Sequence, residues 1–320
     1  MTPPTMKAVV VERFGGPEVL VEKQVPRPEP GPFDALVRVR AAGVNPLDLY
    51  RRAGYANIPE HMRPPLPDLP FIPGVDASGV VVAVGDRVTR LAPGDEVFGL
   101  IRFPALNDGG HAYAEYVTAP QDHLARKPAR LDHLEAAAAP LVALTAQQFL
   151  FDHAGVRPGD AVLVNGAGGG VGHILVQLAA HAGAKVVAVA SGRHRELLER
   201  LGVDTFVDYT VTPVEDWPHG VDFLFDSVGG PQAYRFTPVV RDGGTIMPIF
   251  HGDYRPDRAI TVRHNQVHSD GDQLTALAEL VDAGGLHVAV DSVYPLAEAA
   301  AAHRRAETGH IRGKIVLRVT

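Results

Sequence analysis

The sequence of 320 residues predicts an α/β protein with two parts: a barrel-like, mostly antiparallel β domain and a doubly wound domain with a parallel sheet. The first observation is that short apolar runs separated by turn formers fill the chain up to about residue 126. The second is that strand and helix patterns alternate from about residue 130. Such alternation is typical of parallel strands joined by right-handed crossovers. The predicted domains are 1–126 with 287–320, and 127–286.

Short strands build the predicted β domain. The apolar runs lie at 8–11, 19–21, 35–39, 79–84, 96–98 and 113–117. Residues 56–73 contain six prolines and few periodic positions, which predicts an excursion over the surface. Residues 286–320 return to short strands around an Ala-rich helix at 296–305, and we expect this tail to fold back onto the first domain.

The predicted parallel domain begins with a helical stretch at 134–155 that is broken at Pro140. Its central helix presents Val171, Ile174, Leu175 and Leu178 on one face before Gly183 ends it. Strands are expected at 161–164, 185–190, 221–226 and 245–249, and further helices at 193–201, 232–240 and 273–282.

Composition excludes several classes of protein. The 37 acidic and 30 basic residues give a net charge of −7, so no basic field is available to hold nucleic acid or an anionic membrane. Cysteine is absent, which removes disulfides, thiolate zinc sites and iron–sulfur clusters. Neither a signal peptide nor a run of about 20 apolar residues is visible, so we expect a cytoplasmic protein.

A glycine-rich turn between a predicted strand and a predicted helix is the strongest local motif. Ala167, Gly169 and Gly172 occupy the spaced small-residue positions of a dinucleotide fingerprint, with Gly170 and Val171 between them. Bare backbone there lets pyrophosphate oxygens approach N–H groups at the positive end of the helix. The alternative is a tight turn without a ligand, but so many glycines cost more folding entropy than a plain turn justifies.

The end of the next predicted strand indicates which dinucleotide binds. An acidic residue about 20 positions after the turn would bind the ribose 2′-hydroxyl of NAD, and none is present. Ser191, Gly192, Arg193 and Arg195 instead offer a hydroxyl, open backbone and two guanidinium groups, which suit a 2′-phosphate. The sequence therefore favours NADPH, unless the two arginines are only solvated residues of a first helical turn.

Several sequence blocks, in order, resemble the medium-chain dehydrogenase/reductase superfamily in its zinc-free quinone oxidoreductase branch. The resemblance covers nearly the whole chain and implies a GroES-like domain and a Rossmann-type domain. It rests on residues 42–50 with Gly54, 73–79, 93–99, 143–146, the glycine-rich turn, 226–230 and 310–317. Zinc-dependent relatives carry a catalytic Cys where this chain has Asn45, and Gly-His-Glu where it has Gly74, Val75 and Asp76. The resemblance thus implies that no metal is held.

The same resemblance implies a set of site residues. Asn45, Tyr50 and Thr145 would surround the nicotinamide with Pro46, while Ser191, Arg195 and Tyr209 would bind the 2′-phosphate. Val228, Gly229 and Phe250 would follow the ribose and ring. Asn45 could donate a hydrogen bond to a carbonyl that gains negative charge, and Tyr50 could donate or relay a proton. Asp48 would either anchor the turn or orient Tyr50. The alternative for Asn45 with Pro46 is an ordinary turn that starts a helix, and for Tyr50 a half-buried aromatic.

Three functions remain open at this point. The first is NADPH-dependent reduction of a quinone without zinc. The second is NADPH-dependent reduction of an activated carbon–carbon double bond in an enone or enoyl thioester. The third is an idle NADPH-binding protein that kept the cofactor cleft. The resemblance also implies a homodimer.

Overall fold

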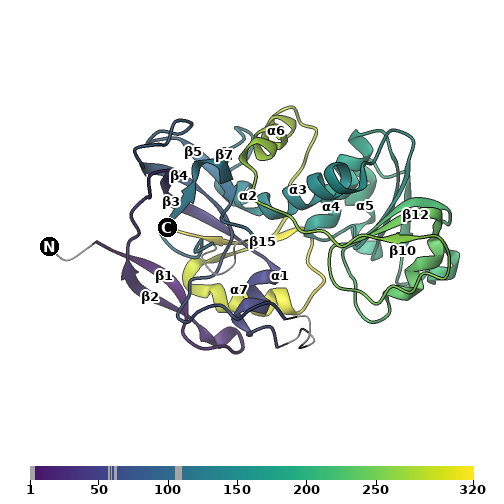
Figure 1. Cartoon of the computed structure of the whole chain (residues 1–320), viewed down its shortest axis with the longest axis horizontal. Coiled ribbons are helices and arrows are strands. Elements are labelled where there is room, and N and C mark those ends of the chain that lie inside the picture. Colours follow the sequence, from purple (N-terminus) through teal and green to yellow (C-terminus); the bar gives the residue numbers. More distant parts are fainter. Residues whose placement is uncertain (1–3, 57, 59, 61–62, 105–109) are drawn as a thin grey trace. The chain divides into compact units, whose positions relative to one another are not determined.

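The computed structural model describes residues 4–56, 58, 60, 63–104 and 110–320. The chain divides into two compact units (Figure 1). The first unit consists of Met1–Leu144, His268–Ala283 and Val288–Thr320, and the second of Thr145–Val267 and Gly284–His287. Helices α2 and α6 therefore cluster with the first unit, whereas the predicted second domain, 127–286, includes them. The domain boundaries of the sequence analysis stay a prediction.

The first unit is built on a mainly antiparallel sheet with strand order β14-β15-β3-β4-β5-β7, and β6 pairs with β3. A separate antiparallel pair joins β1 to β2. The tail does fold back onto this unit, because β15 pairs with β3. The strands are β1 (Thr5–Val11), β2 (Leu20–Pro26), β3 (Asp34–Val44), β4 (Asp76–Val84), β5 (Glu96–Leu100), β6 (Tyr116–Pro120), β7 (Leu124–Arg126), β14 (Val290–Pro295) and β15 (Lys314–Arg318).

Helices complete the first unit around an apolar core. Buried β-branched residues such as Val37, Val97 and Ile315 form that core, as their strand propensity favours. Helix α1 begins directly after β3 because Pro46 takes its first position, where a missing N–H costs nothing. The helices are α1 (Pro46–Arg52), α2 (His133–Ala138), α6 (Gly271–Asp282) and α7 (Ala299–Glu307).

The second unit contains a parallel sheet in the order β10-β9-β8-β11-β12-β13. In chain order this is 3-2-1-4-5-6, the order of dinucleotide-binding sheets, and its direction of winding reverses between β8 and β11. Ligands bind beyond the carboxyl ends of strands at such a switch point. The strands are β8 (Ala161–Asn165), β9 (Lys185–Ala190), β10 (Thr205–Asp208), β11 (Val221–Asp226), β12 (Val240–Pro248) and β13 (Thr261–Val262).

The helical stretches predicted after residue 130 mostly match the structure, with one exception. The stretch at 134–155 does break at Pro140, into α2 and α3 (Pro140–Gln147), and it ends in a π-helical segment, Gln148–Ala154. Helices α4 (Gly170–His181) and α5 (Arg195–Arg200) pack on the sheet as expected. The predicted α-helix at 232–240 is wrong, because Ala233–Val239 forms 3₁₀ turns. Pro238 lies inside this segment and removes an N–H donor.

Shorter 3₁₀ turns connect the elements, and β10 and β13 were not expected from the sequence. The turns are η1 (Pro17–Val19), η3 (Gln121–His123), η5 (Gly192–His194), η6 (Val214–Asp216) and η8 (Leu296–Glu298). Among the described residues, no helix has the length and apolar character to cross a bilayer. The cytoplasmic location stays a prediction.

Candidate active site

Asn45 stands at the junction of β3 and α1, where an acidic side chain fixes the backbone. The Asn45 N–H donates to Asp48 Oδ2 at 2.9 Å, so the carboxylate caps the start of its own helix. The Gly74 N–H donates to Asp48 Oδ1 at 2.9 Å and thereby ties the residues before β4 to the same carboxylate. These bonds support the first of the two roles expected for Asp48, the anchoring of the turn.

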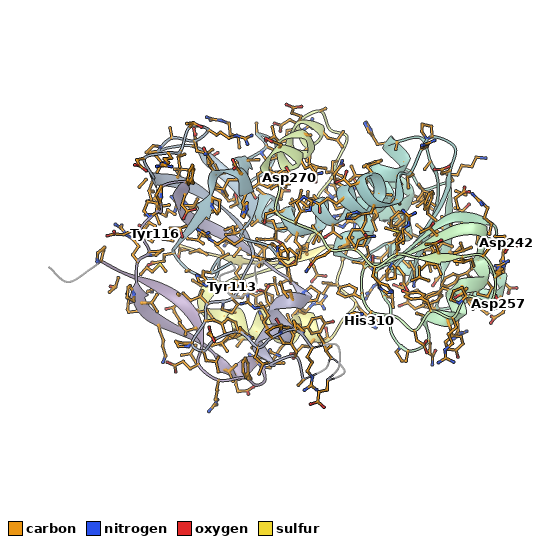
Figure 2. The ribbon with its side chains drawn as sticks, viewed as in Figure 1. Tyr113, Tyr116, Asp242, Asp257, Asp270 and His310 are labelled. Atoms are coloured by element: carbon orange, nitrogen blue, oxygen red, sulfur yellow. The ribbon has the colours of Figure 1, made fainter. Side chains whose placement is uncertain are left out.

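Asp48 lies in the interior of the first unit beside two neutral polar side chains. The Tyr113 hydroxyl lies 3.4 Å from Asp48 Oδ2 and 3.2 Å from His303 Nε2, and all three side chains are fully buried. Figure 2 labels Tyr113. Burial raises the pKa of Asp48 and Tyr113 and lowers the pKa of His303 to about 3. Tyr113 and His303 are therefore uncharged at neutral pH.

The side chain of Asn45 is held from two sides by opposite charges. Asn45 Nδ2 donates to Asp76 Oδ2 at 3.0 Å, and Lys314 Nζ donates to Asn45 Oδ1. Lys314 Nζ also donates to the Val44 carbonyl at 2.7 Å and lies 3.7 Å from Asp76 Oδ2. We call Asn45, Asp76 and Lys314 the Asn45 network.

Burial sets the ionisation of the network. The exposed fractions are 1% for Asn45, 0% for Asp76 and 3% for Lys314. Burial raises the pKa of Asp76 to about 6, against the opposing attraction of Lys314, and burial lowers the pKa of Lys314. The Leu141 N–H donates to Asp76 Oδ1 at 2.8 Å, which supplies the carboxylate with a further partner. Asp76 is mostly ionised at neutral pH, and the three oxygen atoms around Lys314 Nζ favour its ammonium form against the effect of burial.

A cavity of about 320 Å³ in the first unit touches Asn45. Pro46 and Tyr50 line it on the α1 side, and Ile315 contributes an apolar wall. The Tyr50 side chain is half-buried, and burial raises the pKa of its phenol, which therefore remains a proton donor. Arg52 and Glu307, which form an ion pair, also line it. The cavity thus combines an amide, a phenol, one ion pair and apolar walls, and it could admit a small molecule with a carbonyl group.

Thr145 belongs to the second unit, where it lies in α3 with 4% of its surface exposed. The first unit brings together the other predicted catalytic residues, Asn45, Asp48 and Tyr50, along the start of α1. Within the described residues, no group of three or more His, Cys, Asp or Glu side chains could hold a metal ion.

The glycine turn, which we define as residues 166–172, connects β8 to α4. Gly166 has φ of 78°, a conformation that favours glycine, and Gly169 is the N-cap of α4. A Cβ at Gly172 would lie 2.2 Å from the Gly166 carbonyl oxygen, so only glycine lets the turn pack against its helix. The N–H groups of the first helical turn have no acceptor within the helix. The backbone therefore fits the pyrophosphate of a dinucleotide, as the sequence predicts.

The predicted 2′-phosphate residues follow β9 and β10. Ser191 is the N-cap of η5, and the half-exposed Tyr209 donates its N–H to the Ala190 carbonyl at 3.3 Å. Arg193 Nε donates to His194 Nε2 at 3.1 Å. Arg195 lies over the Phe206 ring, 4.4 Å from its centroid, and pairs with Glu199 at 3.2 Å.

An acidic residue that the sequence analysis did not consider also lies there. A Cβ at Gly192 would meet Asp208 Oδ2 at 2.4 Å. Hydrogen bonds from the Thr210 side chain and backbone, and a further one from the Gly192 N–H, hold the pKa of Asp208 below its usual value. A negative charge therefore faces the turn that was expected to receive a phosphate.

Asp226 organises the residues at the carboxyl end of β11. Its Oδ1 accepts from Asn165 Nδ2 at 2.9 Å, and from the Val228 and Gly229 N–H groups at 2.9 and 3.1 Å. Its Oδ2 accepts from the Tyr254 hydroxyl at 2.6 Å. Asn165 ends β8, so this carboxylate joins the two strands that flank the switch point and holds the loop that follows β11.

The remaining predicted residues lie on that side of the sheet. Val228 is 57% exposed and Phe250 follows the end of β12. A Cβ at Gly229, whose φ is 65°, would lie 2.4 Å from the His251 carbonyl oxygen. The predicted residues that follow the carboxyl ends of five parallel strands are thus Ala167, Gly169, Gly170, Val171, Gly172, Ser191, Gly192, Arg193, Arg195, Tyr209, Val228, Gly229 and Phe250.

Comparison with known proteins adds independent findings. Residues 31–129 match the family model described as "Alcohol dehydrogenase GroES-like domain", and residues 201–317 match "Zinc-binding dehydrogenase". A 2-methylene-furan-3-one reductase from Solanum lycopersicum is 36% identical over 98% of this chain and 79% of its own. An NADPH-dependent alkenal/one oxidoreductase from Arabidopsis thaliana, a chloroplastic protein, is 34% identical over 98% of this chain and 80% of its own.

A solved structure extends the likeness to the fold. The quinone oxidoreductase from Coxiella burnetii has a TM-score of 0.85 to this chain and is 32% identical, over 99% of this chain and 100% of its own.

Proposed function

Because the chain belongs to the medium-chain dehydrogenase/reductase superfamily, in its quinone-oxidoreductase-like branch, we propose that it reduces a quinone-type acceptor with NADPH and without zinc. Whichever acceptor it uses, the chain is an NADPH-dependent oxidoreductase, like the relative that carries that name. The nature of the acceptor and the absence of zinc from the reaction are the parts that we propose.

The glycine turn and the residues after β9 and β10 would hold NADPH. The fit rests on the close approach at Gly172 and on the N–H groups of the first turn of α4. Bound NADPH supplies a hydride to an electrophilic carbon. Ser191, Arg195 and Tyr209 would bind its 2′-phosphate, while Val228, Gly229 and Phe250 would follow its ribose and ring.

Asn45 would activate the acceptor. When hydride reaches a quinone, negative charge develops on a carbonyl oxygen, and a fixed N–H donor beside that oxygen stabilises the charge. Asn45 Nδ2 carries two hydrogens, of which one is directed to Asp76. The other would be available to a molecule in the cavity that Asn45 lines. Tyr50, whose phenol stays protonated, would deliver the proton that completes the reduction.

The position of Lys314 is the observation that most supports a reaction without zinc. Its ammonium group donates to Asn45 Oδ1 and lies 3.7 Å from Asp76 Oδ2. These are the oxygen atoms that a metal ion at this place would need as ligands. A divalent cation would have to displace the ammonium group or bear its repulsion. The ammonium group therefore serves as the resident cation of this site.

Reduction of an activated carbon–carbon double bond is the second candidate, because both similar plant proteins are named for such acceptors. The same N–H donor at Asn45 would polarise an enone carbonyl, and the proton would then go to carbon. The test is NADPH consumption with 1,4-naphthoquinone and with cyclohex-2-enone, followed by identification of the products. The quinone should give the higher kcat/KM. A higher kcat/KM with the enone would favour reduction of an activated double bond over quinone reduction. No turnover with either acceptor would favour an idle NADPH-binding protein.

A further inference from the structure

Lys314 is a buried lysine whose side-chain nitrogen faces three oxygen atoms. The register of β15 on β3 pairs Ile315 with Val44, so Lys314 falls at the point where the chain leaves β3 for Asn45. Its Nζ reaches Asn45 Oδ1, the Val44 carbonyl and Asp76 Oδ2. An ammonium group has three N–H donors and no acceptor. Lys314 is therefore held beside Asn45 by two hydrogen bonds and one ion pair, and it is not among the residues that line the cavity.

The two charged neighbours determine which way round the amide of Asn45 stands. Lys314 can only donate, so the atom that faces it must be the oxygen. An ionised Asp76 can only accept, so the atom that faces it must be the nitrogen. A rotated amide would place its NH₂ group against an ammonium and its oxygen against a carboxylate. The orientation of an Asn amide often has to be assigned by judgement, but here electrostatics dictates it.

A fixed amide leaves one N–H with a definite direction. One hydrogen on Asn45 Nδ2 is held by Asp76, and Asn45 lines the cavity together with Ile315, the residue after Lys314. Attraction of the amide oxygen by a cation also draws electrons from the nitrogen and makes its N–H a stronger donor. Lys314 thus controls both the direction and the strength of the donor without touching the cavity.

We propose that Lys314 is a positioning residue for hydride acceptance: it locks the Asn45 amide so that one N–H points at the acceptor carbonyl. This inference rests on the proposed function, since it concerns the donor that the reaction would use. Lys314 was not among the site residues expected from the sequence, and its role is separate from that of a group that touches substrate.

The experiment separates positioning from plain stability. Lys314→Met removes the cation and leaves Asp76 as a buried charge with fewer partners, so this variant should lose both stability and turnover. Lys314→Met combined with Asp76→Asn removes both charges and should recover most of the thermal stability. The amide of Asn45 is then no longer forced into one orientation, so kcat should stay about 10- to 100-fold below that of the parent. KM for NADPH should be unchanged in both the single and the double variant.

Two further variants serve as controls. Lys127 is a partly buried lysine of the first unit, whose Nζ donates to the Pro128 and Leu131 carbonyls at 3.2 and 2.6 Å and lies 3.5 Å from Glu96. Lys127→Met should lower stability without lowering kcat. Asp76→Asn alone keeps Lys314 on Asn45 Oδ1 and should retain more kcat than the double variant. Recovery of both stability and kcat in the double variant would overturn the proposal, as would equal kcat in Lys314→Met and Lys127→Met.

A measurement on the amide itself does not depend on turnover. In ¹⁵N-edited NMR spectra of the full chain, the two Hδ2 signals of Asn45 should be well separated, because only one hydrogen donates to Asp76. The double variant should reduce their separation to that of an unconstrained Asn side chain as the amide samples both orientations. Unchanged Asn45 signals in that variant would contradict the role of Lys314. If the parent protein reduces no acceptor but its Asn45 signals respond as expected, the proposed function fails while the locking of the amide stands.

Discussion

The Asn45 network and the glycine turn present polar groups to small molecules by opposite means. In the network, a buried carboxylate and a buried ammonium group fix one amide, and all three side chains come from segments distant in the sequence. In the turn, the polar groups are backbone N–H donors, and glycine residues without side chains leave room for close approach to them. A site made of side-chain charges is sensitive to charge and pH, whereas a site made of bare backbone is sensitive to added volume.

The largest expected effect comes from volume in the turn. Gly172→Val should abolish detectable NADPH binding, because even its Cβ would lie 2.2 Å from the Gly166 carbonyl oxygen. Fluorescence titration with NADPH measures this. Gly159→Ala is the control in the same unit for an added Cβ without a steric clash. The φ of Gly159 is 90°, so the change strains the backbone, but its Cβ would meet nothing within 4 Å. It should bind NADPH normally. Retained binding in Gly172→Val would show that the turn does not cradle the cofactor.

Loss of the amide donor should have the next largest effect. Asn45→Asp keeps an acceptor for Lys314 but removes the N–H groups, so kcat should fall about 100- to 1000-fold. NADPH affinity should fall much less than kcat, because the turn that would bind pyrophosphate is left intact. Steady-state kinetics and NADPH titration on the same preparation give the two values. Equal losses of kcat and NADPH affinity would make Asn45 a scaffold residue.

The network should also make stability depend on pH. The folded pKa of Asp76, about 6, lies above its ordinary value of 3.8, so the folded state binds the proton more tightly than the unfolded state. The contribution of Asp76 is therefore present at low pH and lost as pH rises from about 4 to about 6. Lys314, the Asn45 amide and the Leu141 N–H face this carboxylate, and Asp48 lies near it.

Asp76→Asn tests this dependence, because an amide cannot ionise. The free energy of unfolding of the parent, relative to this variant, should decrease by up to about 3 kcal/mol across that pH window. Denaturant unfolding at pH 4.5, 5.5 and 6.5 measures the difference. A difference that grows as pH rises would mean that the folded state lowers the pKa of Asp76.

Cofactor preference should respond less strongly, because charges of both signs surround the 2′-phosphate residues. Ser191→Ala with Arg195→Asp should reduce the NADPH to NADH ratio of kcat/KM about 10-fold or more. Asp208→Asn should raise the same ratio by a smaller factor, since it removes the carboxylate beside Gly192. Ratios that do not change in either variant would remove these residues from the 2′-phosphate site.

Prediction from sequence worked where the chemistry is local. The glycine turn, its strand and its helix are contiguous, so their spacing alone predicts the bend and the close packing at Gly172. Pro140 breaks its helix for an equally local reason. The prediction of an α-helix at 232–240 was wrong because the apolar spacing there is helical, while Pro238 favours the tighter 3₁₀ turns.

Contacts between residues that only the tertiary fold brings together could not be predicted from the sequence. Lys314 and Asn45 are 269 residues apart, and only the antiparallel register of β15 on β3 brings them together. Asp208 reaches Gly192 because β10, a strand that the sequence pattern did not reveal, pairs in parallel with β9. A lysine or aspartate in a motif block can be noticed in a sequence, but its partner is supplied by the fold.

The most direct test of the central claim is the rate of NADPH oxidation with 1,4-naphthoquinone by protein treated with a strong chelator and shown to be free of zinc. The account predicts the full rate, because the amide of Asn45, held by Lys314, stabilises the charge on the carbonyl oxygen. A rate that disappears with the metal and returns only when zinc is added would contradict it.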